Sequence, residues 1–409
     1  MRRRKTAKRP GRLLYALAVF ILRLFAFFRF GFVAPRGARN IKEPFVAVCN
    51  HASNYDFVFA LLSLYPKRVN SLAAAYFFHN KYLAWVLNRF HCIPREQFRA
   101  DAASVRRMFE VIASGGSVLI FPEGEVSGTG RTDVFPENIA RLIKRLGVSV
   151  YAVHLYGSHL VNPKWAIYPR SGRVSATLAP VLSAGEVKEL STEDVLSRVQ
   201  SAIAHDEYGW QELNRVPFVA KNPAEKLENL LYKCPRCKAE PALSSEGDRF
   251  FCTACGNAAR MDKFGFLLPE ASDSVIFRHV SDWVEYQRAC IREEALHEGF
   301  AIQAEAELQL HLNTHSLAHT TVGQGTVKLN LEGLSYEGTR NGEHTSLFFP
   351  LSTMFKLPFS SGENFEAPNP AEVVAFVPRD RRMISKFVLA MPVLRELNHE
   401  SELAGGSMR

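Results

Sequence analysis

The sequence predicts an α/β domain, followed by a small cysteine-rich module and a β-rich C-terminal region. Short apolar runs alternate with helical segments from Pro44 to about Phe218, and two Cys-x-x-Cys pairs lie at 234–237 and 252–255. Beyond Phe266, several short segments alternate apolar with polar residues. Strands that alternate with helices are typical of a sheet with covering helices. A chain of 409 residues, 47% of them hydrophobic, can bury a large core and form two to three domains.

The basic charge of the chain is concentrated at its N-terminus. Residues 1–42 contain twelve Lys or Arg and no acidic residue. Since the whole chain has a formal net charge of +9, the residues after these carry a net charge of −3. A basic segment beside an aromatic and aliphatic run suits a membrane surface better than nucleic acid, and we expect no nucleic-acid partner.

The apolar segment from Leu13 to Ala34 is long enough to cross a bilayer, but Arg23 and Arg29 interrupt it. An arginine at the bilayer centre costs about 2.5–3.5 kcal/mol on insertion scales, whereas near a helix end it can reach the interface. We therefore interpret residues 1–35 as a basic membrane-associating helix that lies in the interface or is shallowly re-entrant. A single transmembrane span and a secretory signal peptide are the alternatives.

The α/β region begins with the apolar run Phe45–Cys49, which predicts a strand. Further along, apolar periodicity predicts strands at 117–121, 148–156 and 173–182, and helices at 101–113, 136–146 and 192–203. Loops at strand ends are where an open α/β sheet carries its functional residues.

His51 and Asp56 lie directly after the first predicted strand. A general base needs an imidazole whose proton position is fixed, and a nearby carboxylate can fix it. Five residues on a regular helix lie about 140° apart, so His51 must precede the helix and Asp56 must lie in its first turn. Alternatively, Asp56 closes a capping box with Ser53, and His51 is an ordinary loop histidine. Cys49 could be a nucleophile, but strand alternation favours buried packing.

Two further motifs follow. Cys92-Ile93-Pro94-Arg95 ends an apolar run, and the predicted strand at 117–121 leads into Pro122-Glu123-Gly124. In this order and at these separations, the three motifs resemble the glycerolipid acyltransferase family, meaning 1-acylglycerol-3-phosphate acyltransferases and their relatives. The resemblance covers roughly residues 40 to 190, less than half of the chain.

The resemblance implies a glycerol-3-phosphate-acyltransferase-like sheet with covering helices. It also implies transfer of a fatty acyl group from acyl-CoA or acyl-ACP to the free hydroxyl of a lysoglycerophospholipid, either 1-acylglycerol-3-phosphate or a lysophospholipid. His51 would be the general base and Asp56 would orient it, so no covalent acyl-enzyme and no redox cofactor are needed.

The resemblance also implies that three more residues bind the glycerol phosphate of the acceptor, namely Arg95, Glu123 and Gly124. A guanidinium makes two charge-assisted bonds to phosphate, and a glycine lets a backbone N–H approach an anion. Glu123 would orient the arginine or a glycerol hydroxyl. A surface salt bridge between Arg95 and Glu96 is the alternative for that arginine.

The chain departs from the family after Pro-Glu-Gly. Lysophosphatidate acyltransferases usually continue with Thr-Arg-Ser, whereas this chain continues from Glu125 through Val126 and Ser127 to Arg131. The Ser-Gly-Thr-Gly continuation resembles relatives that reacylate lysophospholipids, which argues against lysophosphatidate as the acceptor. The segment 150–157 stands where the family has a fourth motif, but it lacks the central proline, so it identifies no site residue.

Four cysteines, Cys234, Cys237, Cys252 and Cys255, form two knuckles separated by fourteen residues. This spacing predicts a four-thiolate zinc ribbon with a hairpin between the knuckles. Two disulfides are the alternative. Four thiolates leave no open position for water, so we expect structural rather than catalytic zinc, or a docking surface.

The remaining sequence predicts one helix around Trp283, then strands at 302–312, at 329–350 about an Asn341-Gly342 turn, and at 372–377. A helix follows at 380–397, apart from Pro392. Several strands closed by a helix suit a small barrel of the pleckstrin-homology type. No catalytic constellation is evident there.

We therefore expect four regions: a membrane-associating helix at 1–35, an acyltransferase domain at 36–218, a zinc ribbon at 219–265 and a β-rich domain at 266–409. The expected function is membrane-associated O-acyl transfer on the cytoplasmic face, with membrane lipids as partners. Acyl carrier protein, or a protein bound by the ribbon or the C-terminal domain, are further candidate partners. The rival hypothesis is a non-catalytic membrane adaptor that uses the ribbon and the C-terminal domain.

Overall fold

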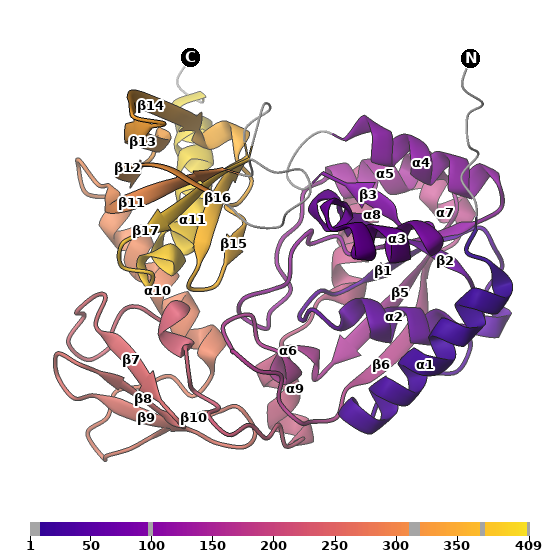
Figure 1. Cartoon of the computed structure of the whole chain (residues 1–409), viewed down its shortest axis with the longest axis horizontal. Helices are drawn as coiled ribbons and strands as arrows, with labels where there is room; N and C mark the ends of the chain where they lie inside the picture. Colours follow the sequence, from indigo (N-terminus) through magenta and orange to yellow (C-terminus); the bar gives the residue numbers. More distant parts are fainter. Residues whose placement is uncertain (1–8, 97–100, 311–319, 369–372, 407–409) are drawn as a thin grey trace. The chain divides into compact units, whose positions relative to one another are not determined.

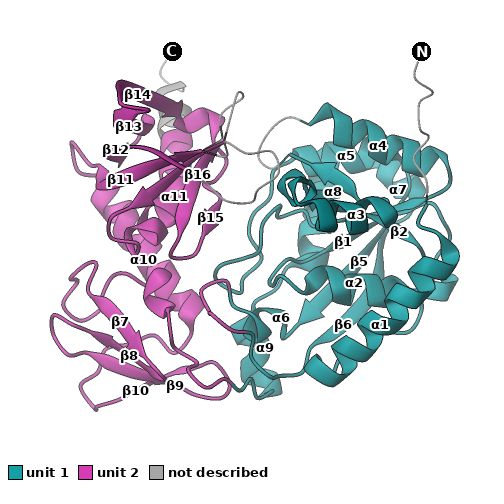
Figure 2. Ribbon diagram, viewed as in Figure 1, with its two compact units in different colours: residues 1–163, 169–219 teal, residues 164–168, 220–409 magenta. Residues whose placement is uncertain are grey.

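The computed structural model describes residues 9–96, 101–310, 320–368 and 373–406. The chain folds into two compact units (Figure 1, Figure 2). The first comprises residues 1–163 and 169–219, and the second comprises residues 164–168 and 220–409. The finer division into four regions stays a prediction.

The first unit is built on a six-stranded sheet with strand order β3-β2-β4-β1-β5-β6. Five strands are parallel, and β6 runs antiparallel to β5. The strands are β1 (Phe45–Cys49), β2 (Val69–Ala74), β3 (Ile93–Arg95), β4 (Ser117–Ile120), β5 (Ser149–Tyr156) and β6 (Ser175–Leu182). The predicted α/β sheet is confirmed.

Helices cover both faces of this sheet, which explains why every residue of β1 and β4 is buried. Alternate strand residues such as Val46, Val118 and Val150 pack in one core with four helices. These are α4 (Ala102–Ala113), α5 (Asn138–Leu146), α7 (Ala184–Glu189) and α8 (Thr192–Ile203). On the other face lie α2 (Asp56–Leu64) and α1 (Arg12–Phe30), which contact each other.

The predicted strands and helices of this unit are present, with ends shifted by at most two residues. The sequence analysis did not identify β2 or four short helices. These are α3 (Lys81–Arg89), α6 (Ser158–Val161), α7 and α9 (Glu207–Asn214).

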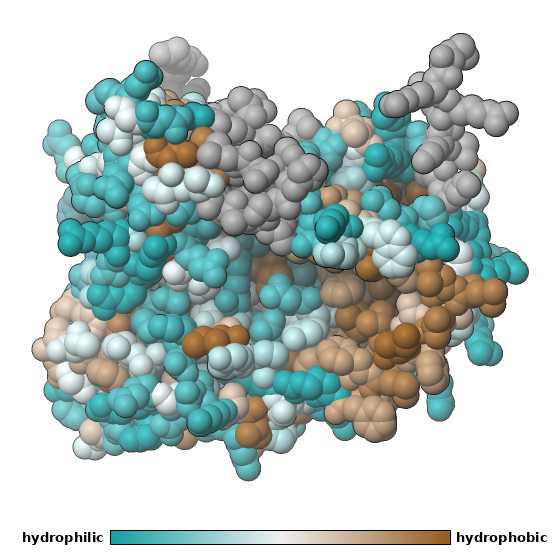
Figure 3. All heavy atoms as spheres, viewed as in Figure 1, coloured by the Kyte–Doolittle hydropathy of each residue, from teal (hydrophilic) through white to brown (hydrophobic). Residues whose placement is uncertain are grey.

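Helix α1 has two apolar faces. Tyr15, Val19, Ala26 and Phe30 are buried at helical spacing, and the Phe30 ring lies 5.5 Å from that of Phe59 on α2. A second apolar stripe is exposed, and Figure 3 shows a large hydrophobic area on this unit. The exposed stripe consists of Leu13, Leu17, Phe20, Ile21, Leu24 and Phe28. Among the described residues, α1 is the one helix that is long and apolar enough to cross a membrane.

In the second unit, a four-stranded antiparallel sheet begins after the first cysteine pair, and Cys252 of the second pair ends one of its strands. Its order is β10-β9-β8-β7, and the predicted hairpin between the knuckles is formed by β7 and β8. The strands are β7 (Leu243–Glu246), β8 (Arg249–Cys252), β9 (Ala258–Met261) and β10 (Leu267–Pro269).

A seven-stranded antiparallel sheet follows, with order β14-β13-β12-β11-β17-β16-β15. Asn341 and Gly342 both have positive φ, as a type I′ turn requires. The strands are β11 (Ile302–Leu310), β12 (Thr320–Leu329), β13 (Gly333–Arg340), β14 (Glu343–Pro350), β15 (Phe359–Ser360), β16 (Asn364–Pro368) and β17 (Val373–Pro378). The β-rich C-terminal region is therefore confirmed, while its pleckstrin-homology type stays a hypothesis. Residues 311, 312 and 372 of the predicted strands lie outside the described residues.

Two helices join the small sheet to the large one. Helix α10 (Val280–Ala295) donates from Trp283 Nε1 to the carbonyl of Lys233 at 3.0 Å. Helix α11 (Met383–Gly406) contains Pro392, and its Lys386 binds Glu240, which also lies 3.3 Å from Lys233. The segment that carries the first cysteine pair is therefore linked to both helices by a hydrogen bond and partly buried ion pairs.

Candidate active site

His51 and Asp56 meet at the carboxyl end of β1. His51 lies in the loop after this strand, and Asp56 is the first residue of α2, as the helical geometry predicts. The ring Nδ1 of His51 lies 2.9 Å from Oδ2 of Asp56. Because this contact fixes Nδ1 as the donor to the carboxylate, Nε2 is left as the basic nitrogen.

Asp56 is fully buried, and its carboxylate accepts hydrogen bonds from the loop after β1. Its Oδ2 also accepts the backbone N–H groups of Ala52 at 2.6 Å and Ser53 at 2.8 Å. Its Oδ1 accepts the hydroxyl of Ser158. The contact with the Ser53 N–H is half of the expected capping box, and the other half is not formed, because the Ser53 hydroxyl accepts the N–H of Tyr55 at 3.0 Å.

The backbone of His51 is fixed on both sides. Its N–H donates to Oε1 of Glu123 at 2.6 Å, and its carbonyl accepts the N–H of Ser127 at 2.7 Å. The imidazole lies against the Phe121 ring, with centroids 4.4 Å apart. The side chain is 21% exposed, and the part of the chain that the structure describes offers no contact to Nε2. The imidazole is therefore partly accessible to solvent.

Glu123 and Gly124 form the turn after β4. The second carboxylate oxygen of Glu123 accepts the N–H of Asp133 at 2.9 Å, so both oxygens bind backbone. Gly124 has φ +72°, where a side chain is strained, and its N–H donates to the Phe121 carbonyl at 3.1 Å. Glu123 thus contacts the loop that carries His51, whereas the Gly124 contact closes the turn after β4.

Arg95 lies at the same edge of the sheet but farther from His51. It ends β3, which β2 and β4 separate from β1, so about three strand spacings of ~4.8 Å lie between them. Burial lowers the pKa of the Arg95 guanidinium, although the charge of Asp101 opposes this. No ion pair joins Arg95 to Glu96 within the described residues. Arg131 is paired with Asp206, with Nε and Oδ2 3.1 Å apart.

Cys49 is buried within β1, directly before the loop of His51. Burial, and secondly the charges of Asp56 and Glu123, raise the pKa of its thiol well above the usual value. The thiol therefore stays protonated and packs as an apolar group, as strand alternation predicted.

The sequence analysis missed the contribution of the loop after β5. Ser158 and His159 begin helix α6 there and are fully buried. Burial lowers the pKa of His159 to about 3, so its imidazole is neutral at physiological pH. The available signal was the predicted strand at 148–156, whose end is followed at once by Gly157 and Ser158.

The four knuckle cysteines of the second unit converge. All four sulfurs lie within 4.8 Å of one another, with Cys234 and Cys255 3.8 Å apart and Cys237 and Cys252 3.7 Å apart. Sulfurs around tetrahedral Zn²⁺ at 2.3 Å are separated by about 3.8 Å, whereas a disulfide needs about 2.0 Å. The cluster therefore fits a structural metal ion and not two disulfides.

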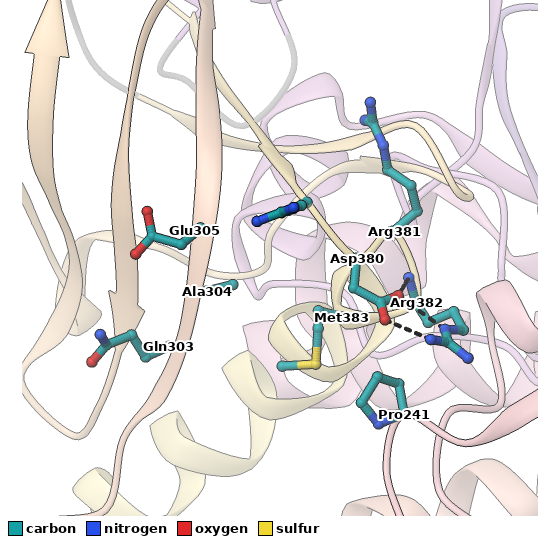
Figure 4. Close-up of a pocket in the computed structure, with 9 residues that line it drawn as sticks. Pro241, Gln303, Ala304, Glu305, Asp380, Arg381, Arg382 and Met383 are labelled. Carbon is teal, nitrogen blue, oxygen red and sulfur yellow. Dashed lines mark hydrogen bonds and ion pairs between the residues drawn. The ribbon is translucent and has the colours of Figure 1, made fainter.

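A pocket of about 610 Å³ opens near the start of α11 (Figure 4). Arg382 is held by Asp380 through contacts of 2.9 and 2.6 Å, and Arg381 donates to the Glu363 carbonyl. The residues that line the pocket are Pro241, Gln303, Ala304, Glu305, Arg379, Asp380, Arg381, Arg382 and Met383. None is a histidine, cysteine, serine or threonine, so the lining residues offer no imidazole, thiol or hydroxyl side chain.

Residues 33–156, which include β1 to β5 and the His51–Asp56 contact, match the family model described as Acyltransferase. This region is similar to the acyltransferase family. The resemblance to glycerolipid acyltransferases is thereby confirmed.

Curated relatives are similar to part of this chain. A chloroplastic 1-acyl-sn-glycerol-3-phosphate acyltransferase of Arabidopsis thaliana is 25% identical over 142 residues, which is 34% of this chain and 39% of that protein. A 1-acyl-sn-glycerol-3-phosphate acyltransferase of Borreliella burgdorferi is 26% identical over 111 residues, 27% of this chain and 44% of that protein. The chain thus spans less than half the length of these relatives.

Among solved structures, the chain is similar to the 1-acyl-sn-glycerophosphate acyltransferase PlsC from Thermotoga maritima. The sequence identity is 21% and the TM-score is 0.40. The match covers 52% of this chain and 84% of that one.

Proposed function

We propose that this protein transfers a fatty acyl group from acyl-CoA or acyl-ACP to the free hydroxyl of a lysoglycerophospholipid, with His51 as the general base. The observation that carries the proposal is the 2.9 Å contact between His51 and Asp56 at the carboxyl edge of the sheet, in a region similar to the acyltransferase family. The curated relatives named as 1-acylglycerol-3-phosphate acyltransferases support the same class of acceptor.

The reaction follows from the orientation of His51. Nε2 removes the proton of the acceptor hydroxyl as its oxygen attacks the thioester carbonyl, and Asp56 stabilises the imidazolium that forms. When the tetrahedral intermediate collapses, the carbon–sulfur bond breaks and the imidazolium returns the proton to the departing thiolate. A positioned base contributes about 10²–10⁴-fold to the rate. The acyl group passes directly to the acceptor.

Arg95 is the proposed ligand of the acceptor phosphate. Its guanidinium lies on the same sheet edge as His51, and burial strengthens charge-assisted bonds to an anion. The contacts of Glu123 and Gly124 with backbone favour a supporting role for these two residues. Arg131 is paired with Asp206, which supports a lysophospholipid acceptor that does not need a second arginine in this loop.

The exposed apolar stripe of α1 supports membrane association. The opposite stripe of the helix packs on the domain from Tyr15 to Phe30, so α1 is attached along its length. Arg29 donates to the carbonyls of Pro169 at 2.9 Å and Arg170 at 3.2 Å, and Arg23 lies over the Tyr65 ring. Both arginines therefore contact protein groups and leave the outer stripe apolar. This arrangement favours a helix in the interface over a transmembrane span, and we place it on the cytoplasmic face.

The proposed metal is zinc, bound by Cys234, Cys237, Cys252 and Cys255. Four thiolates would complete its coordination, so the ion would stabilise the second unit without taking part in acyl transfer. Acyl carrier protein would be a partner as the acyl donor, and the ribbon or the C-terminal domain would bind another protein partner.

The decisive experiment uses the purified full-length protein in mixed micelles. Each of several lysolipids is incubated with acyl-CoA and with acyl-ACP, and diacyl products are measured by mass spectrometry. The panel contains lysophosphatidate, lysophosphatidylethanolamine, lysophosphatidylcholine and monoacylglycerol. We expect His51-dependent transfer to at least one phosphate-bearing acceptor. Absence of transfer for every pair would overturn the proposal in favour of the membrane adaptor.

A further inference from the structure

We propose that Ser158 is a positioning residue for the His51–Asp56 pair. The inference rests on the proposed function of His51. The hydroxyl of Ser158 donates to Oδ1 of Asp56, while Oδ2 of the same carboxylate accepts from His51. The three side chains therefore form a linear chain of contacts from α6 through α2 to the loop after β1.

Ser158 supplies a contact that no other described group replaces. The backbone donors Ala52 and Ser53 both bind Oδ2, so Oδ1 depends on the Ser158 hydroxyl. Asp56 and Ser158 are both fully buried, which means that water does not solvate this oxygen. A buried carboxylate oxygen without a donor is strongly destabilised.

The position of Ser158 is fixed by the residues on either side of it. Glu207 accepts the N–H of Gly157 through Oε1 at 2.6 Å and the N–H of His159 through Oε2 at 3.1 Å. Gly157 has φ +80°, and a Cβ there would lie 2.7 Å from the carbonyl oxygen of Arg173. The turn therefore requires glycine at 157, and Glu207 clamps it so that the hydroxyl reaches Asp56.

The contact fixes the orientation of the Asp56 carboxylate and reduces the negative charge on its oxygens. With Oδ1 held, rotation of the carboxylate is blocked and Oδ2 stays directed at Nδ1. The hydroxyl also withdraws negative charge from Asp56, so its removal should make the field at the imidazole more negative. Among the described residues, the titratable groups around the pair include Glu123 after β4, Cys49 on β1, the buried His159 on α6 and Glu207 on α9.

The test compares Ser158→Ala with Ser63→Ala in the full-length protein. Ser63 lies on the same helix as Asp56, is also fully buried, and donates to the Phe59 carbonyl at 2.7 Å, without contacting the pair. We expect Ser158→Ala to lower kcat about tenfold or more, the factor typical of losing a bond to a charged group. The acidic limb of its pH–kcat/KM profile should move to higher pH. Ser63→Ala should leave kcat within about threefold and the profile unshifted.

A conservative variant separates positioning from folding. Ser158→Thr keeps the hydroxyl and should therefore retain most of the wild-type activity. Thermal unfolding checks that each variant is folded. Equal kcat losses and unshifted profiles for Ser158→Ala and Ser63→Ala would overturn the inference. A His51→Ala variant in the same assay distinguishes the two proposals: if it is inactive while Ser158→Ala behaves like Ser63→Ala, only the role of Ser158 fails.

Discussion

Glu123 holds His51 through its backbone, because Oε1 of the glutamate accepts the His51 N–H at 2.6 Å. The family resemblance implied that Glu123 orients an arginine or a glycerol hydroxyl. In the structure its second oxygen accepts the N–H of Asp133, and the expected role of Glu123 toward the acceptor stays a prediction. Because Glu123 links the loop of His51 to that of Asp133, we expect it to act on the proposed base whatever the acceptor is.

Glu123→Gln should therefore lower kcat/KM for every acceptor by a similar factor, about 10- to 100-fold. The two N–H donors bind different oxygens of the carboxylate, and an amide replaces one of these oxygens with an NH2 group that cannot accept, so one loop contact is lost. The measurement compares lysophospholipid acceptors with monoacylglycerol, which lacks phosphate. A loss confined to the phosphate-bearing acceptors would show that Glu123 contacts the acceptor phosphate region.

His51→Ala should reduce kcat by about 10²-fold or more, since it removes the general base. Asp56→Asn should mainly lower kcat, because an amide cannot stabilise the imidazolium. Single-turnover kinetics with the best donor and acceptor pair measure both, and circular dichroism checks folding. More than about a tenth of wild-type kcat in His51→Ala would exclude the assigned role.

Arg95→Ala should lower kcat/KM about 10- to 150-fold for phosphate-bearing acceptors, from a charge-assisted bond worth about 1.5–3 kcal/mol. Arg131→Ala is the matched control, since it removes a guanidinium paired with Asp206 on the same unit. The control should affect acceptors with and without phosphate equally. An Arg95→Ala loss of the same size with monoacylglycerol would mean that this arginine is not the phosphate ligand.

The cysteine cluster should hold one zinc ion per chain, measured by metal analysis of protein purified without added metal. Cys234→Ser should lose the ion and destabilise the second unit, because the binding energy of such a site is folding energy. Cys290→Ser is the control, since Cys290 lies on α10 outside the cluster. Four freely titrating thiols in the native protein would contradict the metal site.

The outer stripe of α1 should anchor the protein to lipid. Replacing Leu17, Phe20 and Leu24 with serine should weaken binding to neutral vesicles by about tenfold or more, because each side chain loses apolar burial. Sedimentation with neutral and anionic vesicles at low and high salt separates apolar from electrostatic binding. Phe348→Ser, an exposed aromatic on the second unit, is the control. Unchanged sedimentation of the triple variant would assign the membrane contact to another surface.

The local sequence pattern determined much of the secondary structure and part of the candidate sites. Apolar periodicity gave the α/β class, the helix that begins at Asp56 and the β-rich C-terminal region, because burial imposes the periods of strand and helix on sequence. Residue spacing predicted the contact between His51 and Asp56, and the paired knuckles predicted the converging sulfurs. Each of these relationships lies within a short stretch or a fixed motif.

Only the tertiary structure decided which residues, distant in the sequence, contact the His51–Asp56 pair. Glu123 reaches His51 across 72 positions and Ser158 reaches Asp56 across 102, because β4 and β5 both pair with β1 and so bring their carboxyl ends to the same edge. Strand order sets these neighbours, and it depends on packing between whole elements that no local pattern encodes. The same holds for α1: composition predicted an apolar helix, but the packing of Tyr15 to Phe30 on the domain decided which face remains exposed.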